Sequence, residues 1–273
     1  MKTKRIILSI GLVVTATLFF DACKKNDRDS DTDTSASRDN YTAENAFAGI
    51  FKAIGEFSDS TAQLRTSSCA AYSISPVVMD TTTWPKTLTI NYGATDCMCA
   101  DGNLRRGIIT AVFTGQYRKP GTVITVTTSN YYHNDNFVQA GTYTITNNGI
   151  NSAGNLSYTI SVQNATIFAF GGTIKWNSIR TREWIAGEST TLNPWDDVYS
   201  ITGSATGTAV NGNTFDVTIN SPLIVALNCA YIEKGTLTLT PQHLSPRIID
   251  FGSGSCDNAA TVSINGKVYN VMM

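Results

Sequence analysis

Apolar and polar residues alternate along most of the chain after residue 72. The alternation is clearest in the stretches 88–92, 156–162, 215–219 and 237–239, where every second residue is Leu, Ile, Val, Tyr or Phe. A period of two places one side of a strand in a core and the other side in water, which is typical of antiparallel sheets. The spacing of these stretches predicts about eleven to thirteen strands in an all-β fold, either an antiparallel meandering sandwich or an open barrel. A solenoid is the alternative architecture.

One segment near the N-terminus has a different period. From Ala43 to Phe57 the apolar residues stand at positions 43, 46, 47, 50, 51, 54 and 57, which is the spacing of one helix face. Thr42 can cap the N-terminus of such a helix, and Glu44 is favourable in its first turn. We therefore predict one N-terminal packing helix at about residues 42–58, covering an end or a face of the sheet.

Turn signals add hairpins to this prediction. Asn-Gly pairs at 148–149, 211–212 and 265–266 favour tight turns, and the last pair lies between the strand-like stretches TVSI and KVYNV. A longer hairpin is predicted between residues 231–240 and 247–251, around the turn PQHLSP. Its register places Cys229 opposite Cys256, where a disulfide would stabilise the fold by about 3 kcal/mol. A pairing of Cys69 with Cys97 or with Cys99 is the alternative and stays open.

The first 40 residues differ from the rest of the chain. Lys2, Lys4 and Arg5 precede an apolar run over residues 6–20, which is short for a membrane span and typical of a signal peptide, here residues 1–22. Cys23 resembles the acylated cysteine of a bacterial lipoprotein, with residues 20–22 as its lipobox. Residues 23–40 lack apolar bulk, so we predict a disordered, acylated tether there, followed by a single β-rich domain over residues 41–273.

Several stretches carry a resemblance to known sequences. They are KKNDRDSDTDTSASRDN after Cys23, then DGNLRRGIITAVFTGQYRKPGTVITVTTSNYYHND, TIKWNSIRTREWIAG, SITGSATGT and IIDFGSGSCDNAATVSINGK. In these stretches the chain is similar to an uncharacterised family of Bacteroidota outer-membrane lipoproteins. The resemblance implies an exported β-rich domain that is held at the outer membrane, on the cell surface, by an acyl group in the lipid bilayer. It implies no activity.

Charge and cysteine content narrow the class further. Three of the 20 Lys and Arg residues and one of the 21 Asp and Glu residues lie in residues 1–22, so the rest of the chain has a formal charge of −3. Without a basic patch, nucleic acid is not an expected partner. Five cysteines follow Cys23, and disulfides are expected in an exported chain.

Aromatic residues beside carboxylates form the first candidate site. Trp184 and Trp195 bracket a loop-like stretch that runs into Asp196 and Asp197. Aromatic rings can cover the C–H face of a sugar, while carboxylates bind its hydroxyl groups. The stretch YYHND at 131–135 is a second aromatic and polar cluster.

Arginines could add an anion-binding function. Arg180 and Arg182 share one strand face and could grip an anionic ligand, and Arg105 and Arg106 are adjacent. Our default interpretation is that Arg180 and Arg182 pair across strands with Asp196 and Asp197.

Oxygen donors gather in the glycine-rich stretch DFGSGSCDN at 250–258, where Asp250 and Asp257 are the candidate Ca²⁺ ligands. The spacing departs from an EF-hand loop, and the alternative is a turn in which both carboxylates accept backbone N–H groups. No other cofactor is indicated.

Catalytic signatures are weak. His133 and His243 belong to no recognisable triad or metal motif, and the glycine-rich stretch lacks the strand–turn–helix setting of a hydrolase nucleophile. We therefore expect a non-enzymatic lipoprotein that binds a glycan or another extracellular ligand. The alternatives are a structural subunit of an envelope protein complex and, ranked last, a glycoside hydrolase.

Overall fold

The computed structural model describes residues 31–58, 69–76, 82–190 and 193–273. The predicted signal peptide and Cys23 lie outside these ranges. Residues 31–273 form one compact unit, which contains the β-rich domain. Among the described helices, none combines the length and the apolar character that a membrane crossing requires.

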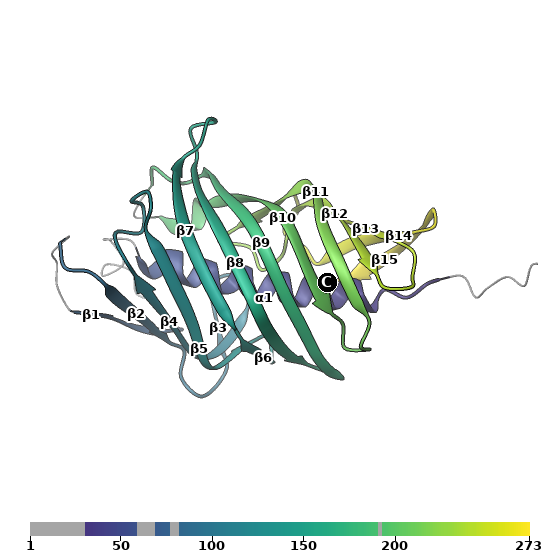
Figure 1. Ribbon diagram of the computed structural model, residues 1–273, viewed down its shortest axis with the longest axis horizontal. Helices are drawn as coiled ribbons and strands as arrows, with labels where there is room; N and C mark the ends of the chain where they lie inside the picture. The colour runs from purple at the N-terminus through teal and green to yellow at the C-terminus, as the bar shows by residue number, and fades with distance from the viewer. Residues whose placement is uncertain (1–30, 59–68, 77–81, 191–192) are drawn as a thin grey trace, which may run out of the picture. The chain divides into compact units, whose positions relative to one another are not determined.

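One antiparallel sheet of fifteen strands contains most of the described residues (Figure 1). The predicted all-β meander with a single N-terminal helix is confirmed. The elements are α1 (Ser35–Ser58), β1 (Ala71–Ser75), β2 (Lys86–Asn91), β3 (Cys97–Met98), β4 (Leu104–Phe113), β5 (Val123–His133), β6 (Asn136–Gln139), β7 (Thr142–Ile150), β8 (Leu156–Ala169), β9 (Gly172–Ala186), the short 3-10 helix η2 (Pro194–Asp196), β10 (Val198–Thr208), β11 (Thr214–Ala226), β12 (Lys234–Pro241), β13 (Arg247–Ser253), β14 (Ala259–Ile264) and β15 (Lys267–Met272).

Nearly every strand pairs with its neighbours in the sequence. There are two exceptions. Strand β2 pairs directly with β4, and the short β3 pairs only with β4. Strand β5 pairs with β7 at its start and with β6 at its end, so that β6 and β7 both also pair with β8. Three of the predicted hairpins are present: Ile264 pairs with Lys267 around the turn at 265–266, Thr208 pairs with Thr214 around residues 211–212, and Leu239 pairs with Arg247 around a turn centred on His243. The turn predicted at 148–149 is wrong, because both residues lie inside β7, where Gly149 has a positive φ beside a register shift in the pairing with β8.

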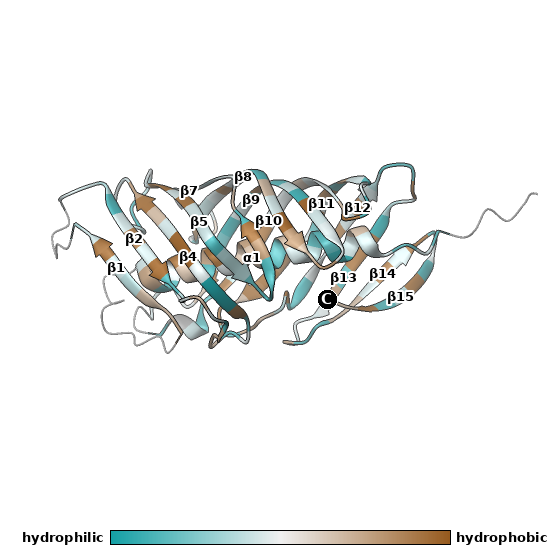
Figure 2. Cartoon of the chain, turned by 90° about the horizontal axis from the view of Figure 1, so that it is seen from below, coloured by the Kyte–Doolittle hydropathy of each residue, from teal (hydrophilic) through white to brown (hydrophobic). Residues whose placement is uncertain are grey.

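Helix α1 lies against one face of this sheet and carries much of the core (Figures 1 and 2). All seven apolar positions that predicted the helix are buried. Aromatic side chains of α1 contact rings on strands at the start, in the middle and near the end of the sheet: Phe57 contacts Tyr72 of β1, Phe47 contacts Trp176 of β9, and Tyr41 contacts Phe251 of β13. The sheet and the helix therefore enclose a single continuous core.

The helix begins earlier than the sequence predicts. It starts at Ser35 rather than near Thr42, and the Thr42 hydroxyl donates to the carbonyl of Arg38 inside the helix instead of capping it. The carboxylate of Asp33 accepts the N–H of Ser35 at the true N-terminus. The prediction of a disordered tether over residues 23–40 is therefore wrong for residues 35–40, and residues 23–30 lie outside the described ranges.

Long-range contacts explain why this segment is ordered. Arg247 of β13 is fully buried, and its guanidinium donates to the carboxylate of Asp31 at 2.8 Å and to the carbonyl of Asp33. The indole N–H of Trp176 donates to Asn40 Oδ1 at 3.2 Å. These partners lie more than 130 residues away in the sequence, so a local reading of residues 31–40 does not reveal them.

The face of the sheet opposite α1 is lined by hydroxyl-bearing residues. One row crosses thirteen strands in continuous register, and nine of its thirteen residues are Ser or Thr: Ser75, Thr87, Val112, Thr125, Thr144, Ser161, Ile179, Ser204, Thr218, Thr238, Ile248, Ser263 and Val268. None of them is buried. This outer face and the apolar inner face give the alternating colours along the strands in Figure 2.

Two disulfides link the described residues. Cys229 bonds with Cys256, which confirms the pairing predicted from the hairpin register. Cys69 bonds with Cys97, and Cys99 keeps a free thiol. The pairing of Cys69 with Cys97, which the sequence offered as an alternative, is therefore present together with the predicted disulfide between Cys229 and Cys256.

Candidate functional site

Two of the predicted ligand-binding residues lie in the core. Arg182 is 1% exposed, and its guanidinium lies 4.1 Å from the ring centroid of Phe51 on α1 and 4.3 Å from that of Tyr199. Trp184 is 5% exposed and packs against Tyr199. Both side chains point to the helix side of β9, so the prediction that they contact a surface ligand is wrong.

The predicted pairing of the arginines is also wrong. Arg180 of β9 forms a buried ion pair with Glu44 of α1, not with Asp196 or Asp197. Burial lowers the pKa of Arg182, since a charged guanidinium in the core loses its hydration. The arginines of β9 therefore face the helix and not an external anion.

The remaining predicted residues lie at η2. Trp195 is 37% exposed, and the exposed carboxylate of Asp196 accepts the hydroxyl of Thr190 with both oxygens at 2.9 Å. Asp197 is buried, and its carbonyl accepts the N–H of Leu227. The five predicted residues thus divide between the surface and the core, and they form no common binding face.

The predicted calcium loop has the geometry of a turn. Asp250 Oδ1 accepts the N–H of Gly252 at 2.8 Å, and Asp257 Oδ1 accepts the N–H of Ala259 at 2.9 Å. Both residues border an open surface cavity of about 400 Å³. Within the described ranges, three metal-ligating side chains converge only at Cys229, Glu233 and Cys256, where the disulfide has used both sulfurs.

A solvent-accessible aromatic row stands out on the outer face of the sheet. We use the term aromatic row for Arg106, Tyr132, Phe137 and Phe168, which are paired in register across β4, β5, β6 and β8. The guanidinium of Arg106 lies 3.7 Å from the centroid of the Tyr132 ring. The ring centroids of Tyr132 and Phe137 are 5.1 Å apart, and those of Phe137 and Phe168 are 5.5 Å apart.

Local backbone features hold the row in place. Asn134 and Asp135 both have positive φ and form the two-residue turn between β5 and β6, the geometry that favours a tight hairpin. The side-chain oxygen of Asn134 accepts the N–H of Leu104, which ties this turn to the start of β4. Gly107 follows Arg106 at a bulge with φ of 89°, where a Cβ would lie 2.0 Å from the carbonyl oxygen of Asn130. Only glycine fits there.

Carboxylates border the cationic end of the row. Arg106 donates to Asp96 and, at 3.1 Å, to Asp135. The carboxylate of Asp135 is largely exposed, while Asp96 and Arg106 are partly exposed. At the other end Phe168 is 44% exposed, and Phe170 in the following turn is fully exposed. The row thus joins apolar ring surface to polar groups that can exchange hydrogen bonds with a ligand.

Charged groups lie on the inner side of the same strands. Arg105 donates to both oxygens of Asp101 at 2.8 and 2.6 Å in a buried pair. Burial opposes the ionisation of Asp101, but the hydrogen bonds and charge of Arg105 outweigh it and lower the pKa of this carboxyl. Burial and the charge of Arg105 lower the pKa of His133 to about 3, so this imidazole is neutral at physiological pH.

A buried lysine completes this inner polar cluster. Lys52 of α1 donates to the carbonyl oxygen of Cys229 at 2.6 Å. Burial lowers the pKa of Lys52 to about 7, with further lowering by Arg182 and Arg105 and an opposing effect of Asp101. These interior groups form structural contacts that hold α1, the sheet and its loops together. Among them, no acidic group is paired with a basic group in the way that acid–base catalysis requires.

The sequence contained a signal for the aromatic row. The stretch 131–135 was identified as an aromatic cluster, but alternation places Tyr131 and His133 in the core and leaves Tyr132 outside. Phe137 and Phe168 join Tyr132 only through pairing between β5, β6 and β8, which residue spacing does not reveal. No protein-family model, no curated protein and no solved structure matches the chain, so the resemblance to a lipoprotein family stays a prediction.

Proposed function

We propose that the protein is a non-catalytic lipoprotein of the outer membrane, anchored through Cys23 on the cell surface, that binds a glycan along the aromatic row. The observation that carries the binding proposal is the in-register array of one guanidinium and three aromatic rings, all accessible to solvent. Rings spaced across adjacent strands offer apolar contact to successive sugars, and Asp96, Asp135 and Arg106 supply hydrogen-bonding groups at one end.

The position of the row supports a binding role over a purely structural one. Cross-strand aromatic pairs stabilise a sheet by about 0.5–1.5 kcal/mol each. That contribution does not require the partial exposure of Tyr132 and Phe137 or the 44% exposure of Phe168. The outer face elsewhere is dominated by Ser and Thr, so the concentration of rings at this place is distinctive.

The binding test uses the full chain in detergent and an array of bacterial, plant and host polysaccharides. We expect Phe137→Ala and Tyr132→Ala to weaken binding at least tenfold, corresponding to about 1.4 kcal/mol. Ile248→Ala is the matched control because Ile248 is also an exposed apolar residue of the outer face, on β13. Equal binding by the wild type, the two aromatic variants and the Ile248→Ala control would contradict the proposal that the aromatic row binds the glycan. Binding that is lost on chelation would instead direct attention to Asp250 and Asp257.

A second candidate function is contact with an envelope protein. The observation that favours it is the fully exposed Phe170 next to Phe168 at the turn between β8 and β9, because exposed aromatic residues often anchor protein interfaces. A photo-crosslinking residue at position 170 would capture such a partner on intact cells. A position on the remote turn at 265–266 serves as the control.

The anchor requires a separate test. Palmitate labelling of the wild-type chain should be lost in Cys23→Ala, since an acylated cysteine has no substitute in that segment. Equal labelling of the two chains would exclude the lipid anchor and, with it, the proposed surface location.

A further inference from the structure

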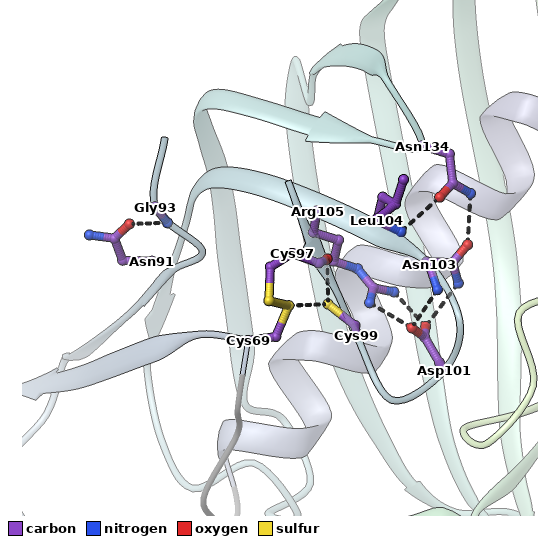
Figure 3. Close-up of a disulfide and its surroundings, with 10 residues drawn as sticks. All are labelled: Cys69, Asn91, Gly93, Cys97, Cys99, Asp101, Asn103, Leu104, Arg105 and Asn134. Carbon is purple, nitrogen blue, oxygen red and sulfur yellow. Dashed lines mark hydrogen bonds and ion pairs between the residues drawn. A yellow bond between two sulfur atoms is a disulfide. The ribbon is translucent and has the colours of Figure 1, made fainter. Parts of the chain in front are cut away.

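Three cysteines lie together where β3 meets β4 (Figure 3). Cys69 and Cys97 form a disulfide, and the Sγ of Cys99 lies 3.1 Å from the Sγ of Cys69. Figure 3 shows the sulfur of Cys69 between the other two. A distance of about 3–3.5 Å is typical of two atoms poised to react. The free thiol is therefore already in contact with the sulfur that it would attack.

We propose that Cys69, Cys97 and Cys99 form an intramolecular thiol–disulfide exchange site. The thiol of Cys99 gives its proton to water, and the resulting thiolate attacks the Sγ of Cys69. A bond forms between Cys99 and Cys69, the bond between Cys69 and Cys97 breaks, and its electron pair leaves with the sulfur of Cys97, which then takes a proton. One disulfide and one thiol are present before and after, so the step needs neither an oxidant nor a reductant.

The backbone keeps the attacking residue in place. Cys97 pairs with Arg105 in the sheet, and the N–H of Cys99 donates to the carbonyl of Asn103 at 2.9 Å. A second bond, from the N–H of Gly102 to the carbonyl of Cys99, closes the tight loop between β3 and β4. Cys97 and Cys99 are thus two residues apart on one short, braced segment, and both have access to Cys69. The exchange requires no long movement of the chain.

The charged groups around Cys99 set the pH at which exchange is fast. Burial raises the pKa of the Cys99 thiol, while the guanidinium of Arg105 opposes this effect. The carboxylates of Asp101 and Glu56 act in the same direction as burial. Because the thiolate is the attacking species, exchange should accelerate as the pH rises into the alkaline range.

The experiment follows which sulfur is free in the folded full chain. The wild-type protein is incubated at pH 9 without added thiol or oxidant, then blocked with N-ethylmaleimide. Cyanogen bromide cleaves after Met98 and so separates Cys97 from Cys99 before mass spectrometry. Cys99→Ser is the matched control, since it keeps the disulfide and removes the attacking group. The disulfide between Cys229 and Cys256 is the internal reference for unwanted scrambling.

The exchange predicts label on both Cys97 and Cys99, with a sum of about one label per chain, as expected for one thiol shared between two sites. The label on Cys97 should be absent from the Cys99→Ser protein, and its rate of appearance should increase at least fivefold from pH 7 to pH 9. Label confined to Cys99 at every pH and time would overturn the proposal. This outcome does not depend on glycan binding, which is measured separately.

Discussion

The carboxylate of Glu44 on α1 accepts a hydrogen bond from the guanidinium of Arg180 on β9, and both side chains are buried. We expect Glu44→Gln to destabilise the protein by about 3–5 kcal/mol because it leaves an uncompensated charge in the core. Replacing both residues by Met should recover most of this loss. Urea unfolding of Glu44→Gln, and of the single variants Glu44→Met and Arg180→Met with their double variant, measures the effect. A loss in the double variant that equals the sum of the single losses would show that the two residues do not interact.

A second prediction concerns Asp31 and Arg247. Asp31→Asn removes the counter-charge of a fully buried guanidinium, so the free energy of unfolding should fall by about 3 kcal/mol. Asp216→Asn on the exposed outer face should change it by less than about 0.5 kcal/mol. Thermal and urea denaturation compare the variants. Equal stability of the Asp31→Asn and Asp216→Asn proteins would mean that the ion pair between Asp31 and Arg247 contributes nothing to the stability of the fold.

Gly49 provides a test of the packing between helix and sheet. Alanine is normally preferred to glycine inside a helix by about 1 kcal/mol. At position 49, however, a Cβ would lie 2.7 Å from Nε2 of His133 and 3.2 Å from a guanidinium nitrogen of Arg105. We therefore expect Gly49→Ala to destabilise the wild-type protein and to be less harmful in a His133→Ala background. Equal losses in both backgrounds would exclude the imidazole as the obstacle.

The buried amine of Lys52 predicts a pH-dependent stability. Its pKa is about 7 in the folded protein against 10.5 for the ordinary side chain. Between these values the unfolded chain binds more protons than the folded chain, so the free energy of unfolding rises with pH. The slope should approach about 1.4 kcal/mol per pH unit for one proton. Lys52→Met should flatten the profile between about pH 7 and 10. Parallel profiles for the variant and the wild type would contradict this assignment.

Sequence periodicity predicted the parts of the fold that depend on local pattern. The seven apolar positions of α1, the turn at 265–266 and the bond between Cys229 and Cys256 all follow from spacing, and the structure confirms them. The start of α1 differs from the prediction because residues 35–40 are polar except for Ala36. This segment is stabilised by contacts with residues far along the chain. Asn40 accepts a hydrogen bond from Trp176, and Asp31 accepts one from Arg247.

The candidate site was harder to predict for a related reason. Trp176 and Trp184 are eight residues apart in β9, and an even separation places both on one face. Both indoles are buried in the core, as this rule requires once one of them is placed there. Arg180 and Arg182 lie between the two tryptophans and are typical of a solvent-exposed face. This face is nevertheless buried, and Glu44 of the helix neutralises the charge of Arg180. The aromatic row, in turn, depends on pairing between strands that single-strand patterns leave open.

The order of strand pairing has a consequence for how the chain reaches this structure. Because most strands pair with their sequence neighbours, the sheet can grow from successive hairpins, each closing a short loop at low entropic cost. Helix α1 is different: its partners are spread from β1 to β13, so its docking must wait for most of the sheet. Helix α1, the first regular element among the described residues, is therefore expected to be among the last to acquire native contacts. Until then, its apolar face is the surface that most needs protection from aggregation.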